Sequence, residues 1–144
     1  MKLMVLNGPN LNMLGIREPE IYGRLTYEQL CNYLEKQGRE LGHLITCYQS
    51  NSEGRLIDYL QQAYFEAYEG IIINPGAYTH YSYAIYDALK GLPLPAVEVH
   101  LSDIYQREAF RRVSVTAPAC LAQISGKGPE GYLEAMQLLQ KQGH

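Results

Sequence analysis

Gly70-Ile71-Ile72-Ile73-Asn74-Pro75-Gly76 is the stretch that decides the fold class of this chain. Its three consecutive isoleucines are β-branched and apolar, which favours a strand buried on both of its faces. Gly70 bounds the run on one side, and an Asn-Pro-Gly turn bounds it on the other. We therefore predict a strand in the centre of a parallel sheet.

Strand-like runs and helical patterns alternate along the rest of the chain. Strands are predicted at residues 2–6, 44–48, 96–99 and 119–124, and helices over residues 26–41, 56–67, 84–89 and 132–139. Thr26 and Gln29, three residues apart, predict a capping box at the start of the first helix. Alternation with short loops implies a parallel sheet covered on both faces. Five strands in 144 residues fit an α/β fold of the flavodoxin-like, doubly wound type.

Composition excludes several classes of protein. We expect a single catalytic domain over residues 1–144, with 47% hydrophobic residues to build its core. A net charge of −3 without a basic cluster argues against nucleic-acid binding, and no apolar run approaches the roughly 20 residues that span a bilayer. Three cysteines, an odd number, do not make a disulfide framework, so free thiols and a cytoplasmic location are expected. The histidines and cysteines lack metal-ligand spacing, so no metal is expected.

Polar side chains collect in three predicted loops. Asn10, Arg17 and Tyr22 follow the first strand, and residues 74–80 follow the third. The fourth strand is followed by His100, Leu101 and Ser102, with Arg107 and Arg111 close behind. Sites in open parallel sheets lie beyond the carboxyl ends of the strands. If the strand order is flavodoxin-like, strands one, three and four are neighbours, and the three loops converge on one pocket.

The loop after the first strand places Arg17 five residues before Tyr22. A tyrosine has a pKa near ~10, so it is a poor base at neutral pH unless its phenolate is stabilised. A guanidinium roughly 4 Å away would contribute about 4 kcal/mol at an effective dielectric of about 20, which lowers the pKa by about 3 units. This loop is therefore predicted to be able to carry a tyrosinate general base.

The other polar residues allow alternative interpretations. Asn74 is also typical of turns, and His80 can cap the helix that follows it or lie on the surface. A buried His100 needs a hydrogen-bond partner, and either Ser102 or Glu98 can serve. Arg107 and Arg111, four residues apart on one helical face, either form a solvated stripe paired with Glu108 or clamp a carboxylate over the pocket.

Two other functions fit these residues less well. A hydrolase that uses Ser102 and His100 would need a nucleophile elbow, and the chain has no G-x-S-x-G motif. A catalytically silent binding module would have no need for Tyr22, Arg17 or His100, and all three are present.

The chain resembles type II 3-dehydroquinate dehydratase nearly end to end. The resemblance is carried by Leu6-Asn7-Gly8-Pro9-Asn10-Leu11-Asn12, Arg17-Glu18-Pro19, Tyr22-Gly23, Gln49-Ser50-Asn51, Glu53-Gly54, Ile73-Asn74-Pro75-Gly76-Ala77-Tyr78-Thr79-His80, Glu98-Val99-His100-Leu101-Ser102, Arg107-Glu108 and Phe110-Arg111. The order and spacing of these motifs together are specific to the family. Three positions depart from the family's common residues, namely Asp103, Tyr81 and Val113.

The resemblance implies a cofactor-free reaction that converts 3-dehydroquinate to 3-dehydroshikimate, in the shikimate pathway or in quinate breakdown. It implies that Tyr22 is the base, aided by Arg17, that Asn10 holds an enolate through a water, and that His100, oriented by Glu98, is the acid. Substrate binding is implied for Asn74, His80, Leu101, Ser102, Arg111 and the lid residue Arg107. It further implies a homododecamer built from trimers, in which Asp87 lies near a neighbouring subunit's site.

Overall fold

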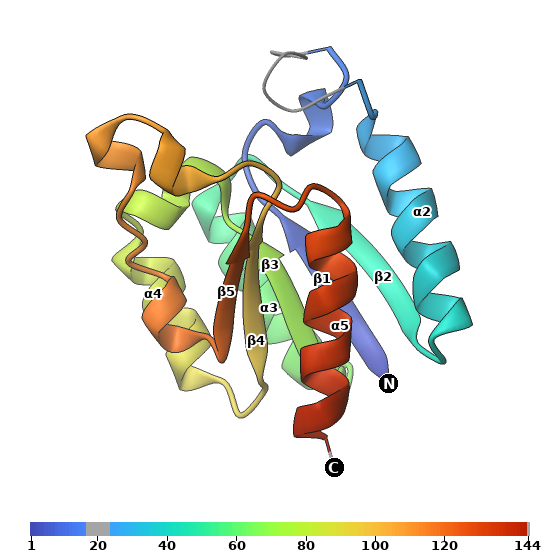
Figure 1. Cartoon of the computed structure of the whole chain (residues 1–144). Helices are drawn as coiled ribbons and strands as arrows, with labels where there is room; N and C mark the ends of the chain where they lie inside the picture. Colours follow the sequence, from blue (N-terminus) through green and yellow to red (C-terminus); the bar gives the residue numbers. More distant parts are fainter. Residues whose placement is uncertain (17–23, 144) are drawn as a thin grey trace.

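The structure is a computed structural model that describes residues 1–16 and 24–143, and its centre is one parallel sheet (Figure 1). The strands are β1 (Lys2–Asn7), β2 (Leu44–Gln49), β3 (Gly70–Asn74), β4 (Ala96–His100) and β5 (Ala122–Ser125). They lie in the order β2-β1-β3-β4-β5, and every neighbouring pair is parallel. This order confirms the predicted flavodoxin-like fold, with the isoleucine-rich β3 in the centre of the sheet.

Helices cover both faces of the sheet. They are α2 (Tyr27–Glu40), α3 (Glu53–Phe65), α4 (Tyr83–Gly91) and α5 (Glu130–Gln142). Figure 1 shows α2 and α5 in front of the sheet and α3 behind it, and α4 packs against α3. Successive residues of a strand point to opposite faces, so each face has its own core. Val5 and Ile72 contribute to the core under α2 and α5, whereas Leu6 and Ile73 contribute to the core under α3 and α4.

Local signals in the sequence define the beginnings of the helices. The capping box at the start of α2 is confirmed, because the Thr26 side chain accepts from Gln29 N and the Gln29 side chain accepts from Thr26 N, both at 3.1 Å. Ser52 and Ser82 cap α3 and α4, because their hydroxyl oxygens accept from Arg55 N and Ile85 N.

Most predicted boundaries lie within three residues of those in the structure, and two of the differences have a clear local cause. The fifth strand begins at Ala122, because Ala117–Ala119 form a 3-10 turn around Pro118, which has no amide hydrogen to donate to a sheet. The second helix ends at Phe65, since Ala67 has a left-handed backbone with φ of 59° that cannot continue a right-handed helix.

The register of the sheet aligns the loops that carry the polar residues. Asn7 at the end of β1 is paired with Asn74 at the end of β3. The loops that follow then pack tightly, since a Cβ on Gly8 would lie only 2.5 Å from the Pro75 carbonyl oxygen. Gly76 has φ of +62°, and a Cβ there would meet Pro9 at 3.1 Å. Glycine is therefore required at both positions for the two loops to approach each other.

In the described part of the chain, no helix combines the length and apolar character needed to cross a membrane.

Candidate active site

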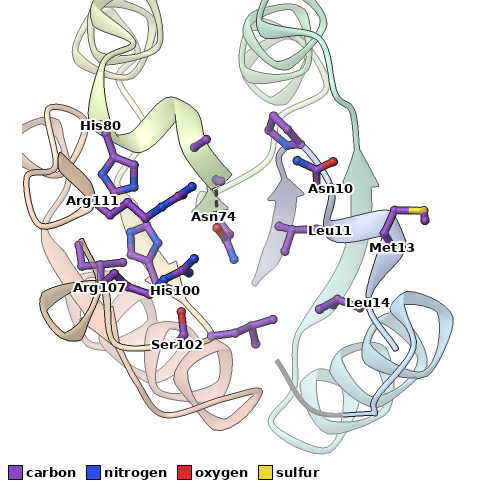
Figure 2. A pocket seen from close by; sticks show the side chains of 15 residues that line it. Asn10, Leu11, Met13, Leu14, Asn74, His80, His100, Ser102, Arg107 and Arg111 are labelled. Carbon is purple, nitrogen blue, oxygen red and sulfur yellow. Dashed lines mark hydrogen bonds between the residues drawn. The ribbon is translucent and has the colours of Figure 1, made fainter. Parts of the chain in front are cut away.

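A cleft of about 670 Å³, counting the space that opens to solvent, lies beyond the carboxyl ends of β1, β3 and β4. Side chains from the loops after these three strands line it, so the predicted convergence is present. Figure 2 shows His80, His100, Arg107 and Arg111 on one side of the cleft. Asn10 and apolar side chains lie on the other side, and Asn74 lies between them.

Asn10 is held in a left-handed backbone conformation, with φ of 71°. Asparagine tolerates this conformation better than most residues, and such outliers are common at functional sites. The Asn51 side chain accepts a hydrogen bond from Asn10 N at 3.0 Å. Gln49 donates to Asn51 at 3.1 Å and to the Gly8 carbonyl oxygen at 3.1 Å. The segment after β2 thus fixes the backbone of Asn10, whose side chain is exposed at the cleft.

Asn74 is tied into a buried polar network under the cleft. Its side-chain oxygen accepts from Gly76 N at 3.1 Å, and its Nδ2 donates to the Tyr132 hydroxyl at 3.4 Å. Tyr132 is fully buried on α5 and donates to Asn7 Oδ1 at 2.7 Å. Burial raises the pKa of Tyr132, so its hydroxyl remains protonated and acts as a donor. The network locks the Asn74 amide in one orientation.

His100 forms a buried pair with Glu98 at the carboxyl end of β4. The two side chains point to the same face because they are two residues apart on one strand. His100 Nε2 lies 2.9 Å from Glu98 Oε2, and Glu98 is fully buried. Of the two partners predicted for His100, Glu98 is therefore the one found. A carboxylate only accepts, so Nε2 carries a hydrogen and Nδ1 is the ring nitrogen left for other partners.

Among the residues that the structure describes, three further groups donate to Glu98. Ser114 Oγ lies 2.8 Å from Oε2, Gln123 Nε2 lies 2.8 Å from Oε2, and Thr116 Oγ1 donates to Oε1. Burial alone would raise the pKa of Glu98, but His100, Thr116 and Gln123 outweigh it and hold this pKa below its usual value. Glu98 is thus a buried carboxylate that stays ionised at neutral pH.

His80 is held by a hydrogen bond at Nδ1, whereas His100 is held at Nε2. Its Nδ1 lies 2.7 Å from the Val113 carbonyl oxygen, and a carbonyl oxygen only accepts, so Nδ1 carries the hydrogen. Burial lowers the pKa of His80, and the nearby His100 and Arg111 lower it further against the effect of the Val113 carbonyl. A neutral His80 therefore has a free electron pair on Nε2, which can accept a hydrogen bond from a ligand hydroxyl.

Arg107 and Arg111 both line the cleft, but the predicted shared helical face is wrong. Residues 104–111 form two separate 3-10 turns, Ile104–Gln106 and Ala109–Arg111. Arg107 and Glu108 between them have extended backbones, with ψ of −174° and 152°, which no helix accommodates. Arg111 Nε lies 2.9 Å from Glu108 Oε2 in an ion pair without well-aligned hydrogen-bond geometry. Arg111 is therefore paired with Glu108 and lines the cleft at the same time.

The predicted site residues as a whole fall into three groups. Asn10, Asn74, His80, His100, Leu101, Ser102, Arg107 and Arg111 line the cleft, and Glu98 lies behind His100. Asp87 is exposed on α4 and is not part of the lining. Arg17 and Tyr22 lie outside the described residues. Asp103, one of the departures from the family's common residues, caps the 3-10 turn that follows it by accepting from Tyr105 N at 2.9 Å.

Sequence reasoning missed two sets of residues. The apolar lining was missed, and it comprises Leu11, Met13, Leu14 and Ile104. The clustered apolar residues directly after Asn10 were the available signal. The hydroxyl and amide donors to Glu98 were missed as well, because they lie 16 to 25 residues from it in the chain. Among the described residues no three histidine, cysteine or acidic side chains are placed to hold a metal ion.

The chain is thus an α/β protein with a cleft at the switch point of a parallel sheet, the place where proteins of this fold type commonly bind small molecules. A family model described as class II dehydroquinase matches residues 1–140. A 3-dehydroquinate dehydratase from Clostridium perfringens strain SM101 is 62% identical over 141 residues, covering 98% of this chain and 97% of that protein. The chain belongs to the class II dehydroquinase family, as its motifs indicated.

Solved structures agree with this assignment. The type II dehydroquinase from Butyrivibrio crossotus superposes with a TM-score of 0.95 at 52% identity, and 97% of each chain is covered. The type II dehydroquinase from Propionibacterium acnes has a TM-score of 0.93 at 43% identity, covering 97% of this chain and 96% of that one.

Proposed function

We propose that this chain is a hydro-lyase that removes water from 3-dehydroquinate through an enolate, without a cofactor. The observation that carries the proposal is the pair formed by His100 and an ionised, buried Glu98 beside a cleft with two arginines. Such a pair can supply a proton to a poor leaving group, and the arginines can bind a carboxylate. The membership of the class II dehydroquinase family supports the same reaction.

In the proposed reaction, the Tyr22 phenolate takes a proton from C2, next to the C3 ketone. The guanidinium of Arg17 lowers the pKa of Tyr22, and Asn10 holds the enolate oxygen through a bridging water. The C1–O bond then breaks, His100 gives its proton to the departing hydroxyl, and the C1–C2 double bond forms. One water leaves, and the conjugated ketone is the product.

The described residues suggest how the substrate is held. The ring carries a carboxylate and hydroxyls, and Arg107 and Arg111 supply positive charge at one side of the cleft. The free electron pair of His80 accepts from a substrate hydroxyl, and the Asn74 amide and residues 101–102 contact the remaining groups. In a dodecamer of trimers, Asp87 of each chain approaches the cleft of a neighbouring one.

The direct test follows the ultraviolet absorbance of the conjugated product after 3-dehydroquinate is added. Tyr22→Phe is expected to remove nearly all turnover while substrate binding persists, because the ring is kept and only the base is lost. Tyr64→Phe is the matched control, since that half-exposed tyrosine on α3 is not part of the cleft. Substantial turnover by the Tyr22 variant would refute the tyrosinate mechanism.

Arg17→Ala tests the partner of the base. Without the guanidinium, the pKa of Tyr22 rises, so activity is expected to appear only at higher pH and to reach a lower maximum. An unchanged pH profile would exclude Arg17 from this role.

Borohydride separates this mechanism from one that uses a lysine Schiff base. In the described part of the chain, no lysine lines the cleft. Borohydride with substrate is therefore expected to leave the enzyme active, and covalent trapping would contradict the proposal.

We further propose that residues 1–144 act as one cytoplasmic catalytic domain, in aromatic biosynthesis or in quinate breakdown. Twelve chains of 16.3 kDa would weigh about 196 kDa, which sedimentation equilibrium can distinguish from a single trimer of about 49 kDa.

A further inference from the structure

Residues 113–116 form a short segment that contacts His80 directly and also contacts Glu98, the partner of His100. The Val113 carbonyl oxygen accepts from His80 Nδ1 at 2.7 Å. Val115 N donates to the Thr79 carbonyl oxygen at 2.8 Å, which anchors the segment beside His80. Ser114 and Thr116 then donate to the two oxygens of Glu98, the partner of His100. One segment is thus bonded to both histidine environments at once.

The two hydroxyls have defined directions. Ser114 Oγ accepts from Ala117 N at 2.9 Å, so its own hydrogen is free to point at Glu98 Oε2. Thr116 is fully buried, and its hydroxyl donates to Glu98 Oε1. Both hydroxyls therefore act as donors to the carboxylate, which keeps Glu98 ionised and able to accept from His100 Nε2.

We propose that residues 113–116 determine which ring nitrogen of each cleft histidine carries the hydrogen. The Val113 carbonyl holds His80 as the Nδ1–H form, which leaves Nε2 as an acceptor. Ser114 and Thr116, acting through Glu98, hold His100 as the Nε2–H form, which leaves Nδ1 to gain and release the transferred proton. Ser114 and Thr116 are positioning residues for the proposed dehydration. The activity assay of this inference rests on that proposed function, whereas the assignment of the ring hydrogens does not.

The two histidines need their hydrogens on different ring nitrogens. His80 accepts from a hydroxyl, whereas His100 must be recharged with a proton and release it to a leaving group. If His100 carried its hydrogen on Nδ1, the electron pair of Nε2 would face the Glu98 carboxylate. The hydrogen-bearing Nδ1 would then face the cleft, where it could not gain the transferred proton. Because residues 113–116 contact both histidine environments, a displacement of this segment would change which nitrogen carries the hydrogen in both rings.

The activity test compares Thr116→Val with Thr116→Ser. Valine keeps the volume but lacks the hydroxyl, so the pKa of Glu98 rises and the acidic limb of the kcat profile moves to higher pH. General acid catalysis contributes about 10²- to 10⁴-fold, and partial loss of its alignment is expected to lower kcat by about tenfold with little change in KM. Thr116→Ser restores the donor and is expected to recover the parent profile.

Thr79→Val is the matched control. Thr79 is also fully buried, and within residues 1–16 and 24–143 its hydroxyl has no hydrogen-bond partner. Its replacement keeps the carbonyl oxygen that accepts from Val115 N, so the kcat and the pH profile are expected to match the parent. A parent-like kcat and pH profile for Thr116→Val would overturn the proposal. If that variant does not fold, Ser114→Ala takes its place with the same expected direction.

The second readout needs no substrate and therefore does not depend on the proposed reaction. Solid-state ¹⁵N NMR of histidine-labelled protein distinguishes protonated from unprotonated ring nitrogens, at about pH 8.5, where ordinary histidines are neutral. His80→Gln and His100→Gln assign the signals. His80 is expected as the Nδ1–H form and His100 as the Nε2–H form, and Thr116→Val or Ser114→Ala is expected to mix the His100 forms. A parent His100 in the Nδ1–H form, or variants that leave its signals unchanged, would overturn the proposal even if the enzyme is active.

Discussion

Glu98→Gln tests the ionised state of the buried carboxylate through stability and not through activity. Glutamine keeps the size of the side chain, and its amide oxygen can still accept from His100, Ser114 and Gln123 while its amino group faces Thr116. The substitution therefore removes mainly the charge. The lowered pKa of Glu98 means that its surroundings, burial included, favour the ionised form over a neutral one.

The size of the effect follows from the hydrogen bonds. A bond to a charged group contributes about 1.5–3 kcal/mol and a neutral one about 0.5–1.5 kcal/mol, so four bonds lose roughly 4–6 kcal/mol of charge assistance. Glutamine avoids part of the cost of burying a charge, which offsets some of that loss. We expect Glu98→Gln to lower the free energy of unfolding by about 2 kcal/mol at neutral pH.

The effect must also depend on pH. The pKa of Glu98 in the folded protein lies below its unfolded value of about 4.3, so its contribution is fully present above that value. The contribution is lost as the pH falls through the folded pKa. Because glutamine does not titrate, the difference between parent and variant is expected to be largest near neutral pH and to shrink in acid.

Urea unfolding followed by far-ultraviolet circular dichroism, at pH 7 and at acidic pH values below 4, measures both quantities. Glu134→Gln is the matched control, because Glu134 forms an exposed ion pair with Lys127 at 2.7 Å. Such surface pairs contribute about 0–1 kcal/mol, so this control is expected to lose little. A Glu98→Gln variant as stable as the parent at pH 7, or a difference that stays constant in acid, would refute the ionised, four-donor carboxylate.

Two further predictions concern loop packing and thiol reactivity. Gly8→Ala places a Cβ about 2.5 Å from the Pro75 carbonyl oxygen, and relief of that contact through backbone shifts is expected to cost about 1–3 kcal/mol of stability in urea unfolding. A parent-like midpoint would show that the two loops separate freely. A hydrogen bond from the Cys47 thiol lowers the pKa of Cys31 to about 7, whereas burial raises the pKa of Cys120 to about 12. Peptide mapping after brief iodoacetamide treatment at pH 7.5 is expected to find Cys31 alkylated before Cys120. Cys47→Ala is expected to slow the alkylation of Cys31. Equal labelling of Cys31 and Cys120 would contradict the expected difference in their pKa values.

The secondary structure was largely readable from the sequence because its signals are local. Three adjacent isoleucines between turn residues predict a buried strand, and a threonine with a glutamine three residues later predicts a helix start. Both features are found in β3 and α2. The wrong boundaries lie where local signals compete, as at Pro118 and at the two separate turns around Arg107.

The position of the cleft was also predictable, since the doubly wound topology brings the loops after β1, β3 and β4 to one edge of the sheet. Eight of the residues singled out from the sequence line the cleft there. Their chemical roles came from a resemblance, because residue type alone left Ser102 and Glu98 equally possible as the partner of His100.

The sequence by itself therefore determined the order of strands and helices, the polar loops and the family, since all of these depend on short-range patterns or on motif spacing. The tertiary structure alone decided the hydrogen-bond partners of those residues. Thr116 and Gln123 reach Glu98 from 18 and 25 residues away, and Tyr132 reaches Asn7 from 125 residues away. Such contacts depend on strand register and on the path of loops in space, and no local periodicity encodes the pairing of distant donors and acceptors.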